Sequence, residues 1–366
     1  MSKQVKYTMG IVLFCEFLIC LGMSLIFPVM PFIRNEYHFS AFDMGMMSSL
    51  FALVQFVASP IVGRISDQTG RKPMLVWGLI VFGLAEFVFA ATSKLWLFDL
   101  SRAVDGLSAA FSGGLMLGPG LGGLLANISY KMPFWVAGVL GIISAIVAFF
   151  ALPADEQEEL QIHTERVDKE LAGSSWDAVK KMMTPALVVL FVMILVSAFG
   201  LAGFESIYSL YVNQVHHFDL TTIAAVLTVN GVLSLLLQVF LFDHLVIWFG
   251  EVQIIRWSFF ISVIGTLIVI YDHSHWQLFV ATLVVYEGFD MLRPAITTLL
   301  TKMSESNQGL LNGINMSLTS IGNIIGPLLS GALLDMNYQA PYLVVAVFML
   351  VSFFITFGVS HEMKTA

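Results

Sequence analysis

The chain is poor in charged residues. Only 11% of its 366 residues are charged, whereas 58% are hydrophobic, and the mean hydropathy is +0.86. Soluble globular domains carry about 25% charged residues, so this chain has too little polar surface to cover a water-facing exterior. The composition excludes an ordinary soluble protein and predicts an all-α integral membrane protein.

Two further absences narrow the functional class. The sequence has no basic patch, and its net charge of −8 is small for its length, so we expect no nucleic-acid partner. Its two cysteines, Cys15 and Cys20, lie five positions apart, which places them on different faces of a helix. We therefore predict neither a disulfide nor a metal site, no cofactor, and no enzymatic activity.

Long apolar runs make up most of the chain. A helix needs about 20 apolar residues to cross a bilayer, and runs this long are helical because barrel strands are shorter. The first run has no small-residue cleavage site, so we interpret it as a span and not a signal peptide. Eleven runs qualify: 8–32, 43–62, 73–92, 95–127, 133–152, 185–212, 222–249, 253–271, 276–300, 308–334 and 340–360.

A repeated frame and one polar stretch divide the chain. The pattern Gly-x-x-x-Gly-Pro-x-x-x-Gly occurs at 114–123 and again at 322–331. Duplicated apolar halves are typical of secondary transporters. We therefore predict two pseudo-symmetric helical bundles, 1–152 and 185–366, joined by a cytoplasmic linker at 153–184.

Lysine and arginine predict the orientation. With the N-terminus in the cytoplasm and alternating spans, twelve of these residues fall inside, and only Arg34, Lys94 and Lys131 fall outside. Both termini are then cytoplasmic. This excess of Lys and Arg on the cytoplasmic side requires that segment 95–127 begin and end on the outer side of the membrane.

The two halves differ in length at that segment. Asp105 lies 13 positions before Gly118, whereas the matching distance from Glu287 to Gly326 is 39 positions. We therefore predict ten full spans plus a shortened or re-entrant 95–127 segment in place of two spans. A single over-long tilted helix is the alternative. The residues expected to break the helix are Gly113, Gly114, Gly118 and Pro119.

The second and third runs are joined by Gly63-Arg-Ile-Ser-Asp67-Gln-Thr-Gly70-Arg71-Lys72. Gly63 and Gly70 would permit a tight turn and a close approach of two helices. Asp67 would pair with Arg71 or with a helix N-terminus, forming a latch that breaks when the bundles rock. A fainter counterpart lies at 242–251.

Ionisable residues inside apolar runs are the strongest functional candidates, because such charges are costly in lipid. Arg102 lies in the fourth run, where Asp105 one turn later would neutralise it. Glu205 and Asp290 would take up and release protons and attract cationic substrates. The alternative for Asp290 is a structural pair with Arg293, one turn away.

Several other side chains would line a substrate pocket. Glu287 is a third acid near the pair, and Glu16 lies in the first run without a supporting motif. The pocket candidates are Phe51, Gln55, Tyr208, Tyr286, Phe289 and Asn315.

Four motifs carry a family resemblance. The 63–72 pattern resembles motif A of the major facilitator superfamily, with Gln68 at a position that is usually basic. Residues 102–106 resemble motif B, the 114–123 frame resembles the antiporter motif C, and 21–31 resembles the first-span motif of drug exporters. From residue 3 to about 360 the chain is similar to the multidrug exporters of Gram-positive bacteria.

The resemblance implies a drug:proton antiporter in the bacterial cell membrane, driven by the proton gradient. It implies proton coupling at Glu205 and Asp290, a relay or pairing role for Arg102, and a drug pocket near Phe51, Gln55, Tyr208, Phe289 and Asn315. Its substrates are hydrophobic and often cationic drugs. Family members carry additional residues between Phe111 and Ser112.

Our leading hypothesis is a monomeric, proton-coupled multidrug exporter that works by alternating access in the lipid bilayer. The first alternative is a variant with the same fold whose shortened segment prevents transport. A carrier of another metabolite and a non-transporting membrane sensor are further alternatives.

Overall fold

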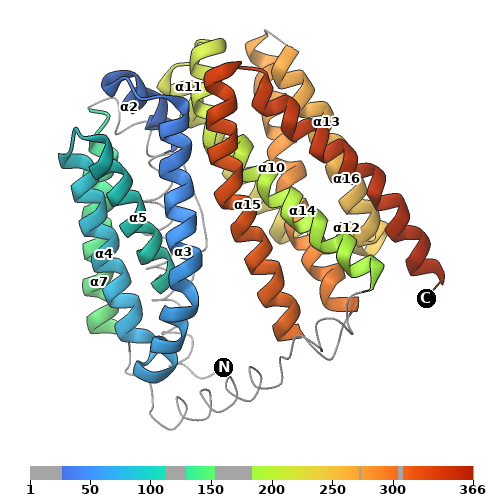
Figure 1. Cartoon of the computed structure of the whole chain (residues 1–366), viewed down its shortest axis with the longest axis horizontal. Helices are drawn as coiled ribbons and strands as arrows, with labels where there is room; N and C mark the ends of the chain where they lie inside the picture. Colours follow the sequence, from blue (N-terminus) through green and yellow to red (C-terminus); the bar gives the residue numbers. More distant parts are fainter. Residues whose placement is uncertain (1–26, 113–128, 153–183, 272–273, 304–307, 366) are drawn as a thin grey trace. The chain divides into compact units, whose positions relative to one another are not determined.

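The computed structural model describes residues 27–112, 129–152, 184–271, 274–303 and 308–365 (Figure 1). Every element in these ranges is helical, so the predicted all-α fold is confirmed. The elements are the 3-10 turn η1 (Phe27–Val29), α2 (Met30–Tyr37), α3 (Ala41–Thr69), α4 (Arg71–Ala91), α5 (Leu95–Ser112), α7 (Met132–Ala151), α10 (Pro185–Val215), α11 (Leu220–Leu236), the π-helical η2 (Leu237–Leu241), α12 (Phe242–Phe249), α13 (Glu251–Tyr271), α14 (His275–Met303), α15 (Gln308–Met336) and α16 (Ala340–Thr365).

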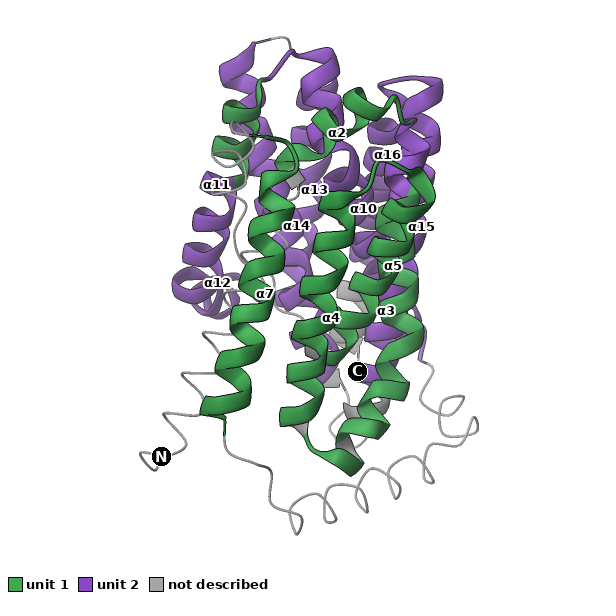
Figure 2. Ribbon diagram, turned by 90° about the vertical axis from the view of Figure 1, so that its left-hand side faces the viewer, with its two compact units in different colours: residues 1–39, 46–173, 219–227 green, residues 40–45, 174–218, 228–366 purple. Residues whose placement is uncertain are grey.

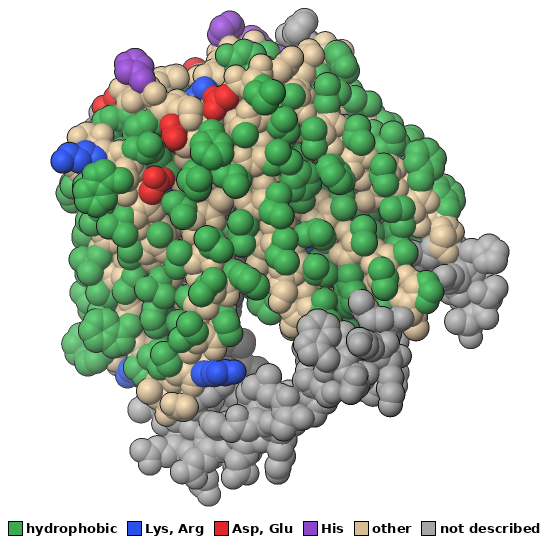
Figure 3. All heavy atoms as spheres, viewed as in Figure 1, with side chains coloured by type: hydrophobic (Ala, Val, Ile, Leu, Met, Phe, Trp, Pro, Cys, Tyr) green, Lys and Arg blue, Asp and Glu red, His purple; other side chains and the backbone are tan. Residues whose placement is uncertain are grey.

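Most of these helices suit a bilayer. Among the described residues, eight helices are long and apolar enough to cross a membrane. Charged residues keep α5 and α14 out of that set. Hydrophobic side chains cover most of the face drawn in Figure 3. The exact number of spans stays a prediction.

The chain forms two compact units (Figure 2). Unit 1 comprises 1–39, 46–173 and 219–227, and unit 2 comprises 40–45, 174–218 and 228–366. In unit 1, α4 packs against α5 and α7. In unit 2, α10 packs against α14, α15 and α16, while α13 packs against α14 and α16. The predicted boundaries at 152 and 184 remain untested, because 153–183 lies outside the described residues.

Helices α4 and α7 run antiparallel in unit 1. Lys131 at the start of α7 donates a hydrogen bond of 2.6 Å to the carbonyl of Thr92 at the end of α4. At the opposite end, Lys72 donates to the carbonyl of Leu152. Because Leu95 follows Thr92 by three residues, the starts of α5 and α7 lie at the same end of unit 1. The two flanks of segment 95–127 are thus on one side, as the orientation argument requires.

The duplication is visible in the backbone. Corresponding helices of the two halves begin 179 or 180 positions apart: α3 and α11, α4 and α13, α5 and α14. The connecting turns repeat as well: His38 and His217 both have φ of 56°, and Gly70 and Gly250 have φ of 94° and 76°. After segment 95–127 the spacing changes, since α7 and α16 begin 208 positions apart. The first half is therefore shorter than the second by 28 positions, not 26.

Contacts explain that correction. A Cβ added to Gly78 would meet the carbonyl of Ser108, and a Cβ added to Gly288 would meet the carbonyl of Ser258. Adding 180 to the positions of the first contact, 78 and 108, gives 258 and 288, the positions of the second contact. Gly288 therefore corresponds to Ser108 and not to Gly106. Matching the Asp-Gly and Glu-Gly dipeptides by sequence was wrong by two positions. Whether the family carries a longer segment here stays a prediction, because 113–128, with Gly118 and Pro119, lies outside the described residues.

The second copy of the Gly-Pro frame packs α15 closely against α10. A Cβ on Gly326 would lie 2.7 Å from the carbonyl oxygen of Phe199 and 2.9 Å from the backbone nitrogen of Gly203. Gly322 approaches the same stretch of α10 at the nitrogen of Phe199. The expected close packing of small residues is therefore present at 322–331.

The first turn of α3 also belongs to unit 2. Asp335 at the end of α15 accepts hydrogen bonds of 2.8 Å from the backbone N–H groups of Ala41 and Phe42. These N–H groups have no partner within their own helix, so the carboxylate caps it. A Cβ on Gly331 would clash with the carbonyl of Ala41, so the helices touch at their backbones.

One expectation about the 63–72 pattern is wrong. Gly63 lies inside α3, which continues to Thr69, and a Cβ added there would meet none of the described residues within 4 Å. The polar residues after the apolar run extend the helix, so the turn falls at Gly70 alone, whose φ is 94°. The side chains of Asp67 and Arg71, and hence the predicted latch, lie outside the described part of the structure.

Candidate functional site

Five buried aromatic side chains of α10, α14 and α16 form a cluster in unit 2. Helix α10 contributes Phe204 and Tyr208, α14 contributes Tyr286 and Phe289, and α16 contributes Tyr342, all at most 3% exposed. The ring centroids of Phe204 lie 5.8 Å from Tyr208, 5.3 Å from Tyr286 and 5.0 Å from Tyr342. Three of the predicted pocket residues thus come together, but as a packed cluster. Phe204 and Tyr342 were not predicted.

The two predicted carboxylates lie beside this cluster. Glu205 and Asp290 are partly buried, and they lie close enough for their charges to interact with each other and with Tyr286. Glu205 follows Phe204 on α10, and Asp290 follows Phe289 on α14. The neighbouring ring in each helix is buried, which fixes the helix face and directs the adjacent acid to the edge of the cluster.

Asp290 is held by a polar chain from α11. Ser234 donates a hydrogen bond of 2.6 Å to Oδ2 of Asp290, and Gln238 donates one of 3.0 Å to the Ser234 hydroxyl. Because the amide of Gln238 is the donor, the Ser234 proton points to the carboxylate. The sequence did not predict either residue, since 56 positions separate Ser234 from Asp290.

The helix changes geometry at that chain. Gln238 lies in η2, a π-helical segment between α11 and α12 that interrupts one long apolar run. Single π-helical turns occur often at functional sites. The predicted 222–249 span is therefore present as three helical pieces.

The alternative pairing of Asp290 with Arg293 is absent from the described ion pairs. Arg293 is exposed on α14, and Asp290 bonds to Ser234 instead. Glu287 lies near Asp290, and neither of its buried carboxylate oxygens has a hydrogen-bond partner in the described ranges. Unit 2 therefore holds three acids within about one helical turn of the cluster.

The remaining pocket candidates lie elsewhere. Asn315 on α15 donates a 3.4 Å hydrogen bond to Thr297 on α14, two turns from Asp290 and so about 10 Å along the helix. Phe51 and Gln55 are partly exposed and one turn apart on α3 in unit 1. There the backbone of Phe51 packs directly against Gly106 of α5.

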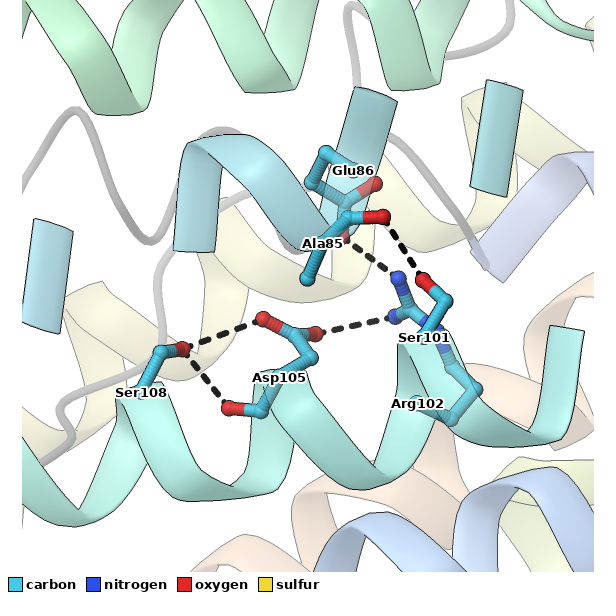
Figure 4. A network of polar contacts seen from close by, with 6 residues as sticks. All are labelled: Ala85, Glu86, Ser101, Arg102, Asp105 and Ser108. Carbon is cyan, nitrogen blue, oxygen red and sulfur yellow. Dashed lines mark hydrogen bonds and ion pairs between the residues drawn. The ribbon is translucent and has the colours of Figure 1, made fainter. Parts of the chain in front are cut away.

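Unit 1 contains a second charged group of residues (Figure 4). Arg102 on α5 forms an ion pair of 3.0 Å with Asp105, as the local alternative predicted, and another of 2.6 Å with Glu86 on α4. Glu86 was not among the predicted site residues. The signal that identified Glu205, a carboxylate inside an apolar run, applies equally to Glu86. No set of three or more His, Cys, Asp or Glu side chains suited to a metal ion occurs in the described ranges.

Buried acids in an apolar, duplicated helical chain point to a transporter, and comparison with known proteins identifies the family. The profile of the Major Facilitator Superfamily matches residues 12–112, 99–242 and 190–364. The chain belongs to the major facilitator superfamily. Solved structures of similar fold include a point mutant of the nucleoside transporter NupG, with a TM-score of 0.77 and 12% identity over 96% of this chain and 99% of that one. A bacterial homologue of the human lysosomal transporter Spinster gives a TM-score of 0.73 at 13% identity, over 99% of this chain and 98% of that one.

Curated relatives are more similar in sequence. "Multidrug resistance protein 1" of Bacillus subtilis is 34% identical, over 93% of this chain and 93% of the relative. "Quinolone resistance protein NorA" of Staphylococcus aureus is 32% identical, over 93% of this chain and 92% of the relative. This superfamily member is therefore a membrane protein of the transporter class and not a member of an enzyme family.

Proposed function

We propose that this superfamily member exports hydrophobic and cationic drugs in exchange for protons. The observation that carries the proposal is the placement of Glu205 and Asp290 together beside the aromatic cluster of unit 2. Two neighbouring acids repel when both are ionised, which favours protonation of one of them. The names of the two curated relatives support drugs as the substrate class.

The acids serve as the coupling groups. A proton entering at Glu205 or Asp290 removes the negative charge that holds a cationic substrate, so protonation favours substrate release. Loss of that proton to the cytoplasm then restores the negative charge that attracts the next cationic substrate. Ser234 orients Asp290 through its 2.6 Å hydrogen bond.

Aromatic side chains give the site its tolerance for different drugs. Tyr208, Tyr286 and Phe289 offer ring faces and edges to flat or cationic molecules. Phe51, Gln55 and Asn315 complete the proposed binding set. Since the rings are packed together in this structure, substrate entry would require them to separate.

The distribution of Lys and Arg supports the proposed location and orientation of the protein. The protein lies in the bacterial cell membrane as a monomer with both termini cytoplasmic, because that orientation keeps most Lys and Arg inside. The proton gradient supplies the energy, and no cofactor is required. Alternating access would occur by rocking of the two halves, with the 63–72 segment and Arg102 acting in gating.

The test is ethidium efflux from cells that express the chain, with and without a protonophore. We expect gradient-dependent efflux, and its loss in Glu205→Gln and in Asp290→Asn. Glu36→Gln, an acid exposed on α2, is the matched control and should export normally. Unchanged efflux in the double variant Glu205→Gln/Asp290→Asn would refute the coupling role. No efflux from a well-inserted wild-type protein would favour the transport-defective alternative.

A further inference from the structure

The ion pairs around Arg102 form one connected polar network inside unit 1 (Figure 4). The guanidinium bonds to Glu86 at 2.6 Å and to Asp105 at 3.0 Å, and it lies 4.7 Å above the ring of Phe89. Ser108 faces Asp105, with its hydroxyl 2.7 Å from the backbone carbonyl and 3.2 Å from Oδ1. Exposure is 0% for Glu86, 6% for Arg102 and 1% for Asp105.

The charges in this network do not balance. Two carboxylates face one guanidinium, so the fully ionised network carries a net charge of −1 away from water. Burying an uncompensated charge is strongly unfavourable, and a buried acid relieves it by taking a proton. Oε2 of Glu86 and Nε of Arg102 are also buried and have no hydrogen-bond partner within the described residues.

Packing does not require these charges. With the 180-position offset between the halves, Glu86 and Arg102 correspond to Thr266 and Thr282 of unit 2, and both threonines are fully buried. Asp105 corresponds to Val285, which is also fully buried. The packing of α13 on α14 in unit 2 thus uses neutral side chains at the positions where the packing of α4 on α5 in unit 1 uses charged ones. Helix packing alone therefore does not explain the charged residues of unit 1.

Few other ionisable residues occur near the network on the described helices α3, α4, α5 and α7. Helix α7, which packs on α4, has no ionisable residue between Met132 and Ala151. On α5 the only other one is Asp99, one turn before Arg102. The ionisable residues of α4 and α3 outside the network lie within the first or last six positions of those helices: Arg71, Lys72, Asp43, Arg64 and Asp67.

We propose that Glu86, Arg102 and Asp105 form a proton-binding site in unit 1, distinct from the acid pair of unit 2, and that Glu86 holds the exchangeable proton. A proton from water binds Oε2 of Glu86 and brings the network from −1 to zero. Glu86 is the carrier because its Oε2 is buried without a hydrogen-bond partner among the described residues, so a proton there displaces no existing hydrogen bond, whereas Oδ2 of Asp105 is held by Arg102.

The experiment is pH-difference infrared spectroscopy of the purified full chain, which follows the carbonyl band of protonated carboxylic acids. The background variant is Glu205→Gln/Asp290→Asn/Glu287→Gln, so that the acids of unit 2 are silent. This choice makes the result independent of the proposed function. We expect one carboxylic acid per chain to titrate in this background in addition to the exposed carboxylates, which ionise near about pH 4.

Adding Glu86→Gln should abolish that band, and so should Asp105→Asn, since either leaves a balanced pair with Arg102. Adding Glu36→Gln should leave it unchanged. If Glu86→Gln fails to fold, the triple variant Glu86→Thr/Arg102→Thr/Asp105→Val reproduces the residues of unit 2 and should fold without the band. A background that shows no titrating acid beyond the exposed carboxylates, or an additional band that survives Glu86→Gln, would overturn the proposal.

Discussion

The close crossing of α10 and α15 gives a quantitative prediction for Gly326→Ala. The added Cβ would lie 2.7 Å from the carbonyl oxygen of Phe199, where ordinary contact begins at 3.4 Å, so the two backbones must separate by about 0.7 Å. Both neighbouring atoms belong to the backbone, so no rotamer change can relieve the clash. Overpacking of this kind costs about 1–3 kcal/mol.

Gly313→Ala is the matched control on the same helix. A Cβ there would meet no atom of the described residues within 4 Å, so the substitution brings the helix propensity of alanine, which stabilises by about 0.5–1 kcal/mol. That propensity gain applies equally to Gly326→Ala. The difference between the two variants therefore isolates the steric cost, and we expect it to be about 1–3 kcal/mol.

The assay is thermal unfolding of both purified variants in the same detergent, together with the wild type. Gly313→Ala should unfold at or above the wild-type temperature, and Gly326→Ala should unfold below it. If Gly326→Ala is as stable as Gly313→Ala, the backbone contact between α10 and α15 is not as close as described, and the role given to the Gly-Pro frame fails.

Three further predictions use other features. Gly250→Ala should destabilise the protein by about 1–3 kcal/mol in thermal unfolding although its Cβ has open space, because φ of 76° with ψ of 156° is strained for alanine; equal stability would refute the strain. Side-chain and backbone hydrogen bonds from Thr222 lower the pKa of Asp219, so its stabilisation is present above the unfolded pKa of about 3.9 and is lost as pH falls through the lower folded pKa. Asp219→Asn should therefore be less stable than the wild type at neutral pH, and this difference in stability should shrink as the pH falls through the folded pKa of Asp219. A difference that does not change with pH would contradict this. Ser234→Ala should reduce efflux several-fold and Ser234→Thr should restore it, whereas Ser197→Ala, whose hydroxyl bonds only its own helix, should have no effect.

Hydropathy predicted the helices because lipid leaves the backbone no other way to satisfy its hydrogen bonds. The run at 185–212 lies within α10 and the run at 253–271 within α13. Hydropathy predicted the helix ends less well. Helix α3 continues past its apolar run to Thr69, because polar residues also form helix where they leave the hydrocarbon, and this displaced Gly63 from the predicted turn.

The site was predictable only where its chemistry is local. Glu205 and Asp290 were found because a carboxylate in an apolar run is costly wherever it lies. Their partners are not local: Ser234 reaches Asp290 across 56 positions, and Glu86 reaches Arg102 across 16. Asp105 was found as a partner of Arg102 because a helix brings positions three apart together.

The repeat explains why the chemistry of one half does not predict that of the other. Backbone features recur at 179 or 180 positions, including the turns at Gly70 and Gly250. The acids of the two candidate sites do not recur, because Asp290 corresponds to Ala110 and Glu86 corresponds to Thr266. Duplication thus preserved what packing requires and left the charged positions free to diverge.

Each unit consequently has its own proposed proton site, and the two sites share no residue. Neutralising Glu205 and Asp290 should abolish coupling to drug while leaving the acid of unit 1 titratable. Neutralising Glu86 should remove the infrared band of unit 1 and leave the acids of unit 2 titratable. The number of protons exchanged per substrate should then fall by one when the network of Glu86 and Arg102 is replaced by the threonines of unit 2. An unchanged proton count would mean that unit 1 binds its proton without moving it during transport.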